Sequence, residues 1–529
     1  MLRVNEVKLA LDRDEKEIPS LISKMLRIAE SDIISWSINK KSIDARNKSN
    51  IYMVYSIDIK VNDEETLLKR NHKKGILKVN EDSIIYQNKT RTGLRPIIVG
   101  TGPAGLFCGL VLSELGFNPI IIERGKTVEE RVKDVSKFWN TGELNPESNV
   151  QFGEGGAGTF SDGKLTTQVN NPRSKKILEY FVEAGAPEEI LYYNKPHIGT
   201  DLLRGVVKNI RNRIISNGGE IKFGKKLTGL SILENKITGI VINNNEQIAC
   251  DKLILALGHS ARDTFEMLND SGIKIEQKSF SIGVRIEHSQ ALINKNQYGE
   301  SFMHPKLKPA EYKLSNHFDN GRSAYTFCMC PGGQVVAAAS EEGMLVTNGM
   351  SKYSRKLETA NSALLVGVGP DDFEGSHPLA GVEFQRKWER LAFIEGGMNY
   401  NAPAQKVGDF LKNKSSTSIG ELDPSYLPGV KMTDISNCLP DYVVETLRKA
   451  IILFDKRIKG FGDESAIMTG VETRSSSPIR IKRDEDFQSN IKGIFPIGEG
   501  AGYAGGIMSS ALDGLRIAEY LGFLKEEVK

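Results

Sequence analysis

Cysteine and long apolar runs are scarce in this sequence. Five cysteines occur in 529 residues, and none has the spacing of a zinc site (Cys108, Cys250, Cys328, Cys330 and Cys438). We therefore expect reduced thiols, a reducing compartment and no metal site. No uncharged apolar run is long enough to cross a bilayer, and the first residues lack the apolar segment of a signal peptide. These absences predict a cytoplasmic protein with no membrane partner.

Charge of one sign is not in excess either. The 70 Lys and Arg residues nearly balance the 67 Asp and Glu residues, and the formal net charge is +3. Nothing global therefore requires a nucleic-acid partner, although the mild positive bias lies in residues 1–95, where 69–78 is a basic run. We interpret that run as a solvated face, so a nucleic-acid partner is not expected. The sequence leaves the oligomeric state open.

A nucleotide-binding signature follows this segment. The apolar run Ile97–Val99 predicts a buried parallel strand, and Gly100, Gly102 and Gly105 complete a G-x-G-x-x-G turn. Gly100 permits the tight turn, and Gly102 lets a pyrophosphate approach the backbone. Gly105 lets the following helix pack closely on the strand. The three glycines predict a dinucleotide site.

The residues after the glycines have the expected context. A helix is predicted from Ala104 to about residue 115, with Pro103 at its start, so that its free N–H groups point at the phosphate. The next apolar run, 119–122, ends at Glu123, which can accept the hydroxyls of an adenosine ribose, and Arg124 follows. Strand, turn, helix, strand and terminal acid together predict a Rossmann-like βαβ unit.

Gly109 extends this pattern to G-x-G-x-x-G-x-x-x-G, which resembles the FAD-binding form of glutathione-reductase-type flavoproteins. The resemblance implies non-covalent FAD. NAD(P)H is a candidate for a transient electron donor, and the sequence leaves the electron donor open. A second stretch, 364–372, mimics a nucleotide fingerprint but has Asp372 in place of the third glycine. We therefore expect no separate NAD(P)H domain.

A second glycine-rich segment spans residues 152–165. Its five glycines cannot stabilise a helix or strand, but their consecutive N–H groups can form an anion-binding concavity. We predict that it covers the cofactor pyrophosphate or the flavin edge; a flexible surface hairpin is the alternative. The predicted cofactor contacts are Gly156, Gly158, Ser161, Asp162, Gly163 and Lys164.

The central part alternates in three short segments, 220–223, 227–233 and 237–242, before the apolar run 253–257. A meander followed by a buried strand resembles the insertion found in FAD-dependent oxidoreductases, where that strand returns to the nucleotide sheet. Gly258 ends the strand beside the cofactor. His259 should lie near the adenine as a structural hydrogen-bond partner rather than a catalyst.

The C-terminal part carries the second strong signal. An apolar strand from Ile494 runs into a glycine-rich turn and a helix that begins near Ile507. Such a helix N-terminus can stabilise negative charge on a reduced flavin. The stretch resembles the C-terminal flavin motif of this superfamily, in which an Asp holds the ribityl chain; here Glu499 takes its place. The predicted contacts are Gly498, Glu499, Gly505, Gly506 and Ile507.

Together these motifs resemble the uncharacterised FAD-dependent dehydrogenases of bacteria. The expected fold class is α/β: a Rossmann-like FAD-binding domain with its βαβ unit, a mixed α+β substrate domain and a small ferredoxin-like α+β N-terminal domain. The predicted domains are residues 1–90 (N-terminal), 91–278 (FAD-binding), 279–455 (substrate) and 456–529 (FAD-binding, C-terminal part), with a polar linker at 88–95.

The predicted function is that of an FAD-dependent oxidoreductase acting on a small-molecule substrate. Arg285, Arg322 and Arg474 are the expected clamps for an anionic substrate, because a planar guanidinium matches a carboxylate. Cys328 and Cys330 are interpreted as packing residues rather than a redox-active disulfide. No catalytic acid or base is identified. The alternatives are an RNA-acting flavoprotein that uses the basic N-terminal domain, or a non-catalytic FAD-binding protein.

Overall fold

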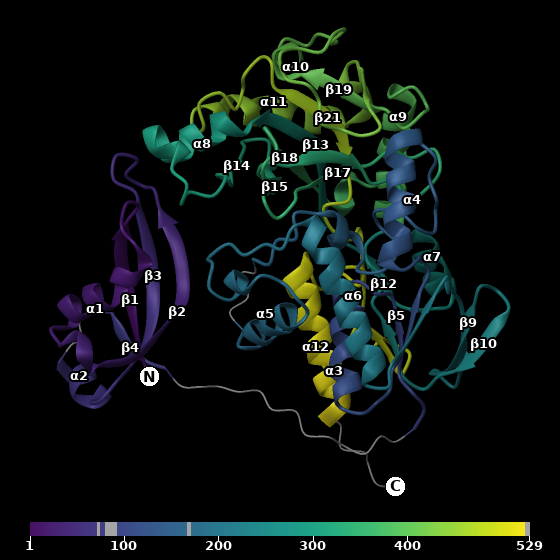
Figure 1. Cartoon of the computed structure of the whole chain (residues 1–529). Coiled ribbons are helices and arrows are strands. Elements are labelled where there is room, and N and C mark those ends of the chain that lie inside the picture. The colour runs from purple at the N-terminus through teal and green to yellow at the C-terminus, as the bar shows by residue number, and fades with distance from the viewer. Residues whose placement is uncertain (71–74, 80–92, 167–170, 524–529) are drawn as a thin grey trace.

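The computed structural model describes residues 1–70, 75–79, 93–166 and 171–523 (Figure 1). Most of the expected linker, 88–95, and the middle of the basic run, 69–78, lie outside these ranges. The fold is mixed α/β, with parallel and antiparallel sheets. Within the described ranges, no helix is long and apolar enough to cross a membrane.

Residues 2–78 form a four-stranded antiparallel sheet, the N-terminal sheet, with the order β2-β3-β1-β4. Its elements are β1 (Leu2–Ala10), α1 (Ile18–Leu26), β2 (Ile33–Asp44), β3 (Tyr52–Val61), α2 (Glu64–Arg70) and β4 (Ile76–Lys78). This chain order and strand order are those of a ferredoxin-like unit. The sequence pattern missed β2 because two bulges interrupt its alternation and many of its side chains are exposed.

A five-stranded parallel sheet is built from distant parts of the chain, in the order β23-β11-β5-β6-β7. Its strands are β5 (Ile97–Val99), β6 (Ile120–Glu123), β7 (Glu220–Phe223), β11 (Leu253–Leu255) and β23 (Ile494–Pro496). Helices α3 (Pro103–Glu114) and α12 (Ile507–Phe523) lie side by side against it (Figure 1). Both glycine-rich turns therefore follow strands of one sheet.

The first segment of the expected three-segment meander lies in a different sheet from the other two. The first segment, β7, pairs with β6 at the edge of the parallel sheet. The separate three-stranded sheet consists of β8 (Leu227–Leu233), β9 (Lys236–Ile242) and β10 (Glu246–Ala249). The other helices of this part are α4 (Val128–Thr141), α5 (Arg173–Glu183), α6 (Thr200–Ser216) and α7 (Arg262–Asp270), and β12 (Ile275–Gln277) pairs with β22 (Ile479–Ile481).

A seven-stranded sheet lies beyond the carboxyl ends of the parallel strands. Its order is β14-β15-β18-β13-β21-β19-β20. The strands are β13 (Phe280–Ser289), β14 (Ser315–His317), β15 (Ser323–Cys330), β18 (Thr359–Val368), β19 (Ala402–Lys406), β20 (Val430–Met432) and β21 (Ile467–Glu472). The helices and the remaining strand pair are α8 (Gln290–Tyr298), α9 (Ala380–Glu395), α10 (Val407–Leu411), α11 (Asp441–Asp455), β16 (Gln334–Ala337) and β17 (Thr347–Met350).

Two details of this sheet differ from the sequence patterns. The stretch that mimics a second fingerprint is the internal strand β18, and only a short turn of helix follows it at Pro370–Asp372. Strand β21 belongs to the same sheet, although a division at residue 456 would assign it to the C-terminal FAD-binding part. The chain thus returns to the parallel sheet later than the pattern predicts.

Candidate functional site

A cavity of about 780 Å³ lies between the carboxyl ends of the parallel strands and the seven-stranded sheet. One side is formed by the first fingerprint, the segment 151–166 and the turn before α12. The other side is formed by 311–313, 326–330, 346–349 and 472–475. The cavity is within the size range of cofactor sites, and it joins the two glycine-rich turns.

The fingerprint glycines meet the demands that the sequence predicts. Gly100 has φ +104°, and a Cβ on Gly105 would lie 1.9 Å from the carbonyl oxygen of Gly100. At Gly102 a Cβ would meet nothing closer than the Cα of Gly156, at 4.0 Å. Pro103 and Ala104 also line the cavity. The free N–H groups of α3 therefore face open space that suits a phosphate.

Glu123 lines the cavity, but its carboxylate is occupied by protein donors. Oε2 accepts from the backbone N and Oγ1 of Thr101, at 2.9 and 2.6 Å, and Oε1 accepts from the backbone N of Gly125 and Gly153, at 2.9 and 3.1 Å. These four bonds fill the ordinary capacity of a carboxylate. Glu123 thus braces three loops, and its contact with a ribose stays a prediction.

Arg124 has a similar bracing role beside the cavity. Its guanidinium pairs with Glu147 and Asp263 and lies 4.1 Å from the ring centre of Phe152. The half-buried His259 lines the same cavity, and its Nδ1 lies 3.0 Å from Oγ of Ser260. Burial, with Arg474 and Arg262 nearby, lowers the pKa of His259 to about 3. It therefore stays neutral at physiological pH, and its structural role stays a prediction.

Arg131 of α4 holds the second glycine-rich segment and the residues just before it in place. This fully buried guanidinium donates to five carbonyl oxygens, those of Asn149, Val150, Gly153, Glu154 and Gly156. A Cβ on Gly153 would collide with the Arg131 side chain at 2.5 Å. The segment is therefore a fixed wall of the cavity rather than a surface hairpin. Nothing in the sequence pattern singles out Arg131.

The three polar residues predicted to contact the cofactor from this segment, Ser161, Asp162 and Lys164, line the cavity with different partners. Oγ of Ser161 accepts from the backbone N of Gly163 and donates to the carbonyl oxygen of Gly158. Asp162 is buried against Arg355 and Ser351. Burial acts to raise the pKa of Asp162, but Arg355 and Lys164 outweigh it and hold that pKa below its ordinary value. Asp162 is thus an ion-pair partner whose carboxylate is engaged.

The turn before α12 supplies the other glycine-rich wall. No atom lies within 4 Å of a Cβ built on Gly505, Gly506 or Gly258, so their backbones border open space. Gly498 is packed instead, because a Cβ there would lie 2.7 Å from the Cβ of Ala104. The described residues that line the cavity include Ile507 but not Gly498. The N-terminus of α12 therefore faces the cavity, as a flavin site requires.

Glu499 presents a carboxyl group to the cavity. Enclosure raises its pKa to about 7, although Lys278 acts in the opposite direction. No hydrogen bond to its side-chain oxygens is found among the described residues. Its oxygens are therefore available to the hydroxyls of a ribityl chain.

The three arginines predicted to clamp substrate are all engaged by the protein. Arg322 pairs with Asp372 at 2.5 and 2.7 Å and does not line the cavity. Arg285 is fully buried behind the cavity wall, where it bonds Asn361, Glu472 and the carbonyl oxygen of Cys328. These two assignments are corrected. Both guanidiniums hold loops and strands together.

Arg474 does line the cavity, but it belongs to a buried ion cluster. It pairs with Glu389 at 2.8 Å and donates to Ser260 and Ser340. Glu389 also binds the buried Arg262 at 2.7 Å. Burial, together with the neighbouring Arg262, lowers the pKa of Arg474 from its ordinary value. The cluster joins the cavity to α9, so Arg474 is a structural group at the cavity wall.

Cys328 and Cys330 both line the cavity as free thiols. A bulge in β15 falls between Phe327 and Cys330, and Cys328 has φ +41°. The Cys330 thiol donates to the carbonyl oxygen of Cys328 at 3.2 Å. Cys330 is buried, whereas Cys328 is exposed to the cavity. Desolvation by the surrounding protein raises the pKa of the Cys328 thiol to about 12, so it stays protonated. The interpretation of the two thiols as packing residues stays a prediction.

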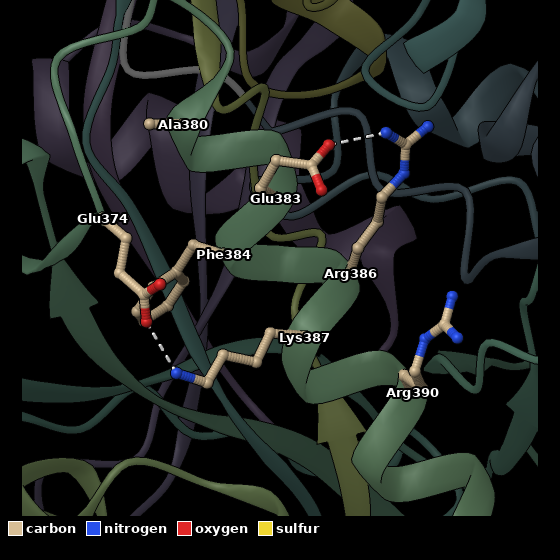
Figure 2. Close-up of a pocket in the computed structure, with 7 residues that line it drawn as sticks. All are labelled: Glu374, Ala380, Glu383, Phe384, Arg386, Lys387 and Arg390. Atoms are coloured by element: carbon tan, nitrogen blue, oxygen red, sulfur yellow. Dashed lines mark hydrogen bonds and ion pairs between the residues drawn. The ribbon is translucent and has the colours of Figure 1, made fainter.

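A second, smaller pocket of about 300 Å³ lies on the outer face of α9 (Figure 2). Arg386 pairs there with Glu383 at 2.7 Å, and Lys387 pairs with Glu374 at 2.8 Å. Its lining residues come from neither glycine-rich turn. The larger cavity is therefore the candidate functional site.

Solved flavoprotein structures show only a distant likeness. A halogenase PltM variant in complex with FAD has a TM-score of 0.38 at 10% identity, covering 80% of this chain and 68% of its own. The L-proline dehydrogenase of P. horikoshii has a TM-score of 0.35 at 12% identity, covering 80% and 92%. Values this low carry no argument about the reaction.

Sequence comparisons are more specific. Residues 279–475 match the family described as "FAD-dependent protein, C-terminal domain-like", and residues 1–60 match a domain of unknown function. An uncharacterized protein of Clostridium beijerinckii is 51% identical over 524 residues, covering 98% of each chain. The open backbone at both glycine-rich turns fits FAD, which is the cofactor. The chain belongs to the family of this Clostridium beijerinckii protein, as a FAD-dependent flavoprotein.

Proposed function

We propose that this flavoprotein is an oxidoreductase that passes a hydride between N5 of FAD and a small molecule held against the seven-stranded sheet. When bound, FAD supplies the redox chemistry. The supporting observation is the extent of the cavity, which continues past the turn before α12 to Thr326–Cys330 and Glu472–Ser475. This part of the cavity is lined by strands β15 and β21 and the residues after β21 rather than by the nucleotide fingerprint, which supports a place for a second molecule.

The roles of the chain in this proposal are orientation and electrostatics. The N-terminus of α3, with Gly102 beside it, binds the pyrophosphate, and the opposing Gly156 keeps the backbone flat. The N-terminus of α12 stabilises negative charge on the flavin, which lowers the cost of reduction. Glu499 holds the ribityl chain. These FAD-binding groups belong to residues 91–278 and to the C-terminal turn and helix that begin after β23. The substrate wall is supplied by residues 326–330 and 472–475.

Anaerobic reduction of the bound flavin tests this function. The purified protein is mixed without oxygen with NADH, NADPH and a panel of metabolites, and loss of the oxidised-flavin absorbance is followed. Saturable reduction by one donor supports the proposal. If dithionite reduces the flavin but no donor in the panel does so, the reading as a non-catalytic FAD-binding protein is favoured.

A further inference from the structure

Three segments converge on the cavity beside Cys328–Cys330. Residues 162–166 and 196–199 run side by side, with backbone bonds from Leu165 N to Pro196 O at 2.9 Å and from Ile198 N to Gly163 O at 3.1 Å. An ion pair of 3.5 Å between Lys195 and Glu311 ties the third segment, 311–313, to them. This arrangement gathers Lys164, Lys195 and Lys313, which we call the lysine group, on the cavity lining.

Positive charge exceeds negative charge around the lysine group. With Arg355, four cations face two carboxylates, Asp162 and Glu311. A third carboxylate of the same lining, Glu472, pairs with Arg285. Asp162 is committed to Arg355, and Lys164 is 3.8 Å from the same carboxylate and donates to the carbonyl oxygen of Met329. Glu311 is shared between Lys195 and Arg355, at 3.5 Å each. Among the described residues, no carboxylate forms an ion pair with Lys313.

Two neighbouring titratable groups, His197 and Glu311, do not cancel this excess. Burial lowers the pKa of His197 to about 4, with a further contribution from Arg355. Burial acts to raise the pKa of Glu311, yet Lys164, Lys195 and Arg355 hold that pKa below its ordinary value. His197 is therefore neutral at physiological pH and adds no charge, and Glu311 is ionised and already counted. The lysine group keeps its surplus of positive charge.

We propose that the lysine group binds the anionic group of the substrate, a carboxylate or a phosphate. This inference rests on the proposed function and identifies the class of its substrate. The arginines expected to do this are engaged elsewhere, whereas Lys195 and Lys313 lie at the exposed rim and Lys164 lies deeper beside Met329. Ammonium groups on flexible stems accept either anion, because they act as point charges.

The test uses the holoprotein, so that the pyrophosphate of FAD already occupies its own site. Calorimetric titration with inorganic phosphate, acetate and neutral acetamide measures binding directly. We expect saturable binding of at least one anion and none of acetamide. The anion that binds more tightly distinguishes a phosphate from a carboxylate substrate.

A double variant and a control variant test whether the lysine group is the anion-binding site. Lys164→Gln combined with Lys313→Gln should weaken anion binding about tenfold or more, which corresponds to roughly 1.4 kcal/mol. Lys387→Gln is the matched control, because its ammonium pairs with Glu374 (Figure 2) and Lys387 is not among the described residues that line the cavity. Flavin content, measured on each variant, confirms that the fold is intact.

The outcomes separate this inference from the proposed function. If no anion binds, or if the double variant with full flavin content binds as tightly as the parent, the lysine group is not the site. If a metabolite donor reduces the flavin in that case, the oxidoreductase function stands alone. If anions bind at the lysine group but no donor reduces the flavin, the subsite stands and the function fails.

Discussion

Gly102 and Gly156 lie backbone to backbone at the edge of the cavity, and a Cβ on Gly156 would lie 3.0 Å from the Cα of Gly102. The two residues belong to different glycine-rich segments, which come within contact distance only in the folded chain. Their approach leaves the N-terminus of α3 open toward the cavity. Both segments therefore border the same part of the cavity.

The first prediction concerns this pair. Gly102→Val should give a colourless protein, because the side chain would occupy the space that the pyrophosphate needs, and FAD binding should weaken at least about tenfold. The ratio of flavin to protein absorbance after purification measures the effect. Gly205→Val, at an exposed helical position with open space around it, is the control. Full flavin occupancy in Gly102→Val would contradict the assignment.

The second prediction concerns Arg131. Arg131→Met should lower the free energy of unfolding by about 3 kcal/mol or more, because five buried carbonyl oxygens lose a charged donor. Denaturant unfolding with and without added FAD measures both stability and cofactor binding. Arg46→Met, which removes an exposed ion pair with Asp44, should change stability little. Equal losses in the two variants would show that Arg131 does not hold the segment.

The third prediction concerns the N-terminal sheet. A chain shortened to begin at Thr92 should still bind FAD, because the described cavity lining starts at Val99. The backbone N of Lys41 on β2 donates to the carbonyl oxygen of Tyr192 at 2.7 Å, and the N of Asn194 donates to that of Lys41 at 2.8 Å. The sheet therefore steadies the chain next to Lys195.

The same contact can be tested in the full chain. Lys41→Pro removes the N–H that donates to Tyr192 O, and an edge strand tolerates proline. It should weaken anion binding severalfold relative to Lys41→Ala, which keeps that N–H, at unchanged flavin content. Equal affinities in the two variants would show that the cavity does not depend on the N-terminal sheet.

The fourth prediction concerns Cys328 and Cys330. Anaerobic dithionite titration should give equal electron uptake, about two per FAD, in the parent and in Cys328→Ser/Cys330→Ser, because the thiols are free and protonated. An additional uptake of about two electrons by the parent alone would require a disulfide. The protein would then belong with the flavin-disulfide reductases.

The fifth prediction concerns Glu287 of β13, a buried carboxyl group that accepts hydrogen bonds from Ser425. Burial raises its pKa from 4.5 to about 7, although the bonds from Ser425 oppose the shift. Between these two pH values the unfolded chain has lost the proton and the folded chain keeps it. Stability should therefore fall as pH rises through this window, by up to about 3 kcal/mol from this group.

Urea unfolding of Glu287→Gln against the parent measures this contribution. The glutamine cannot ionise, so the difference in unfolding free energy between the two proteins should change across the window and level off above it. Glu421→Gln, at an exposed position, is the control. A difference that is independent of pH would show that Glu287 titrates normally.

The sequence by itself determined the FAD fingerprint and its setting. Gly100, Gly105 and the apolar strands around them act within about thirty residues, and turn geometry and strand periodicity are properties of local sequence. The same holds for the strand and helix that flank the C-terminal glycine-rich turn. Local patterns therefore predicted the elements that bind the cofactor, with bounds close to those observed.

Only the tertiary structure decided which charged side chains are available to a ligand. Asp162 meets Arg355, and Arg474 meets Glu389, across 193 and 85 residues. An arginine near a strand end looks the same in the sequence whether its partner is a substrate or a buried glutamate. Burial of a charge is costly without a partner, so the fold paired these arginines internally and left lysines at the cavity rim. Such pairing depends on contacts between distant segments, which no local pattern contains.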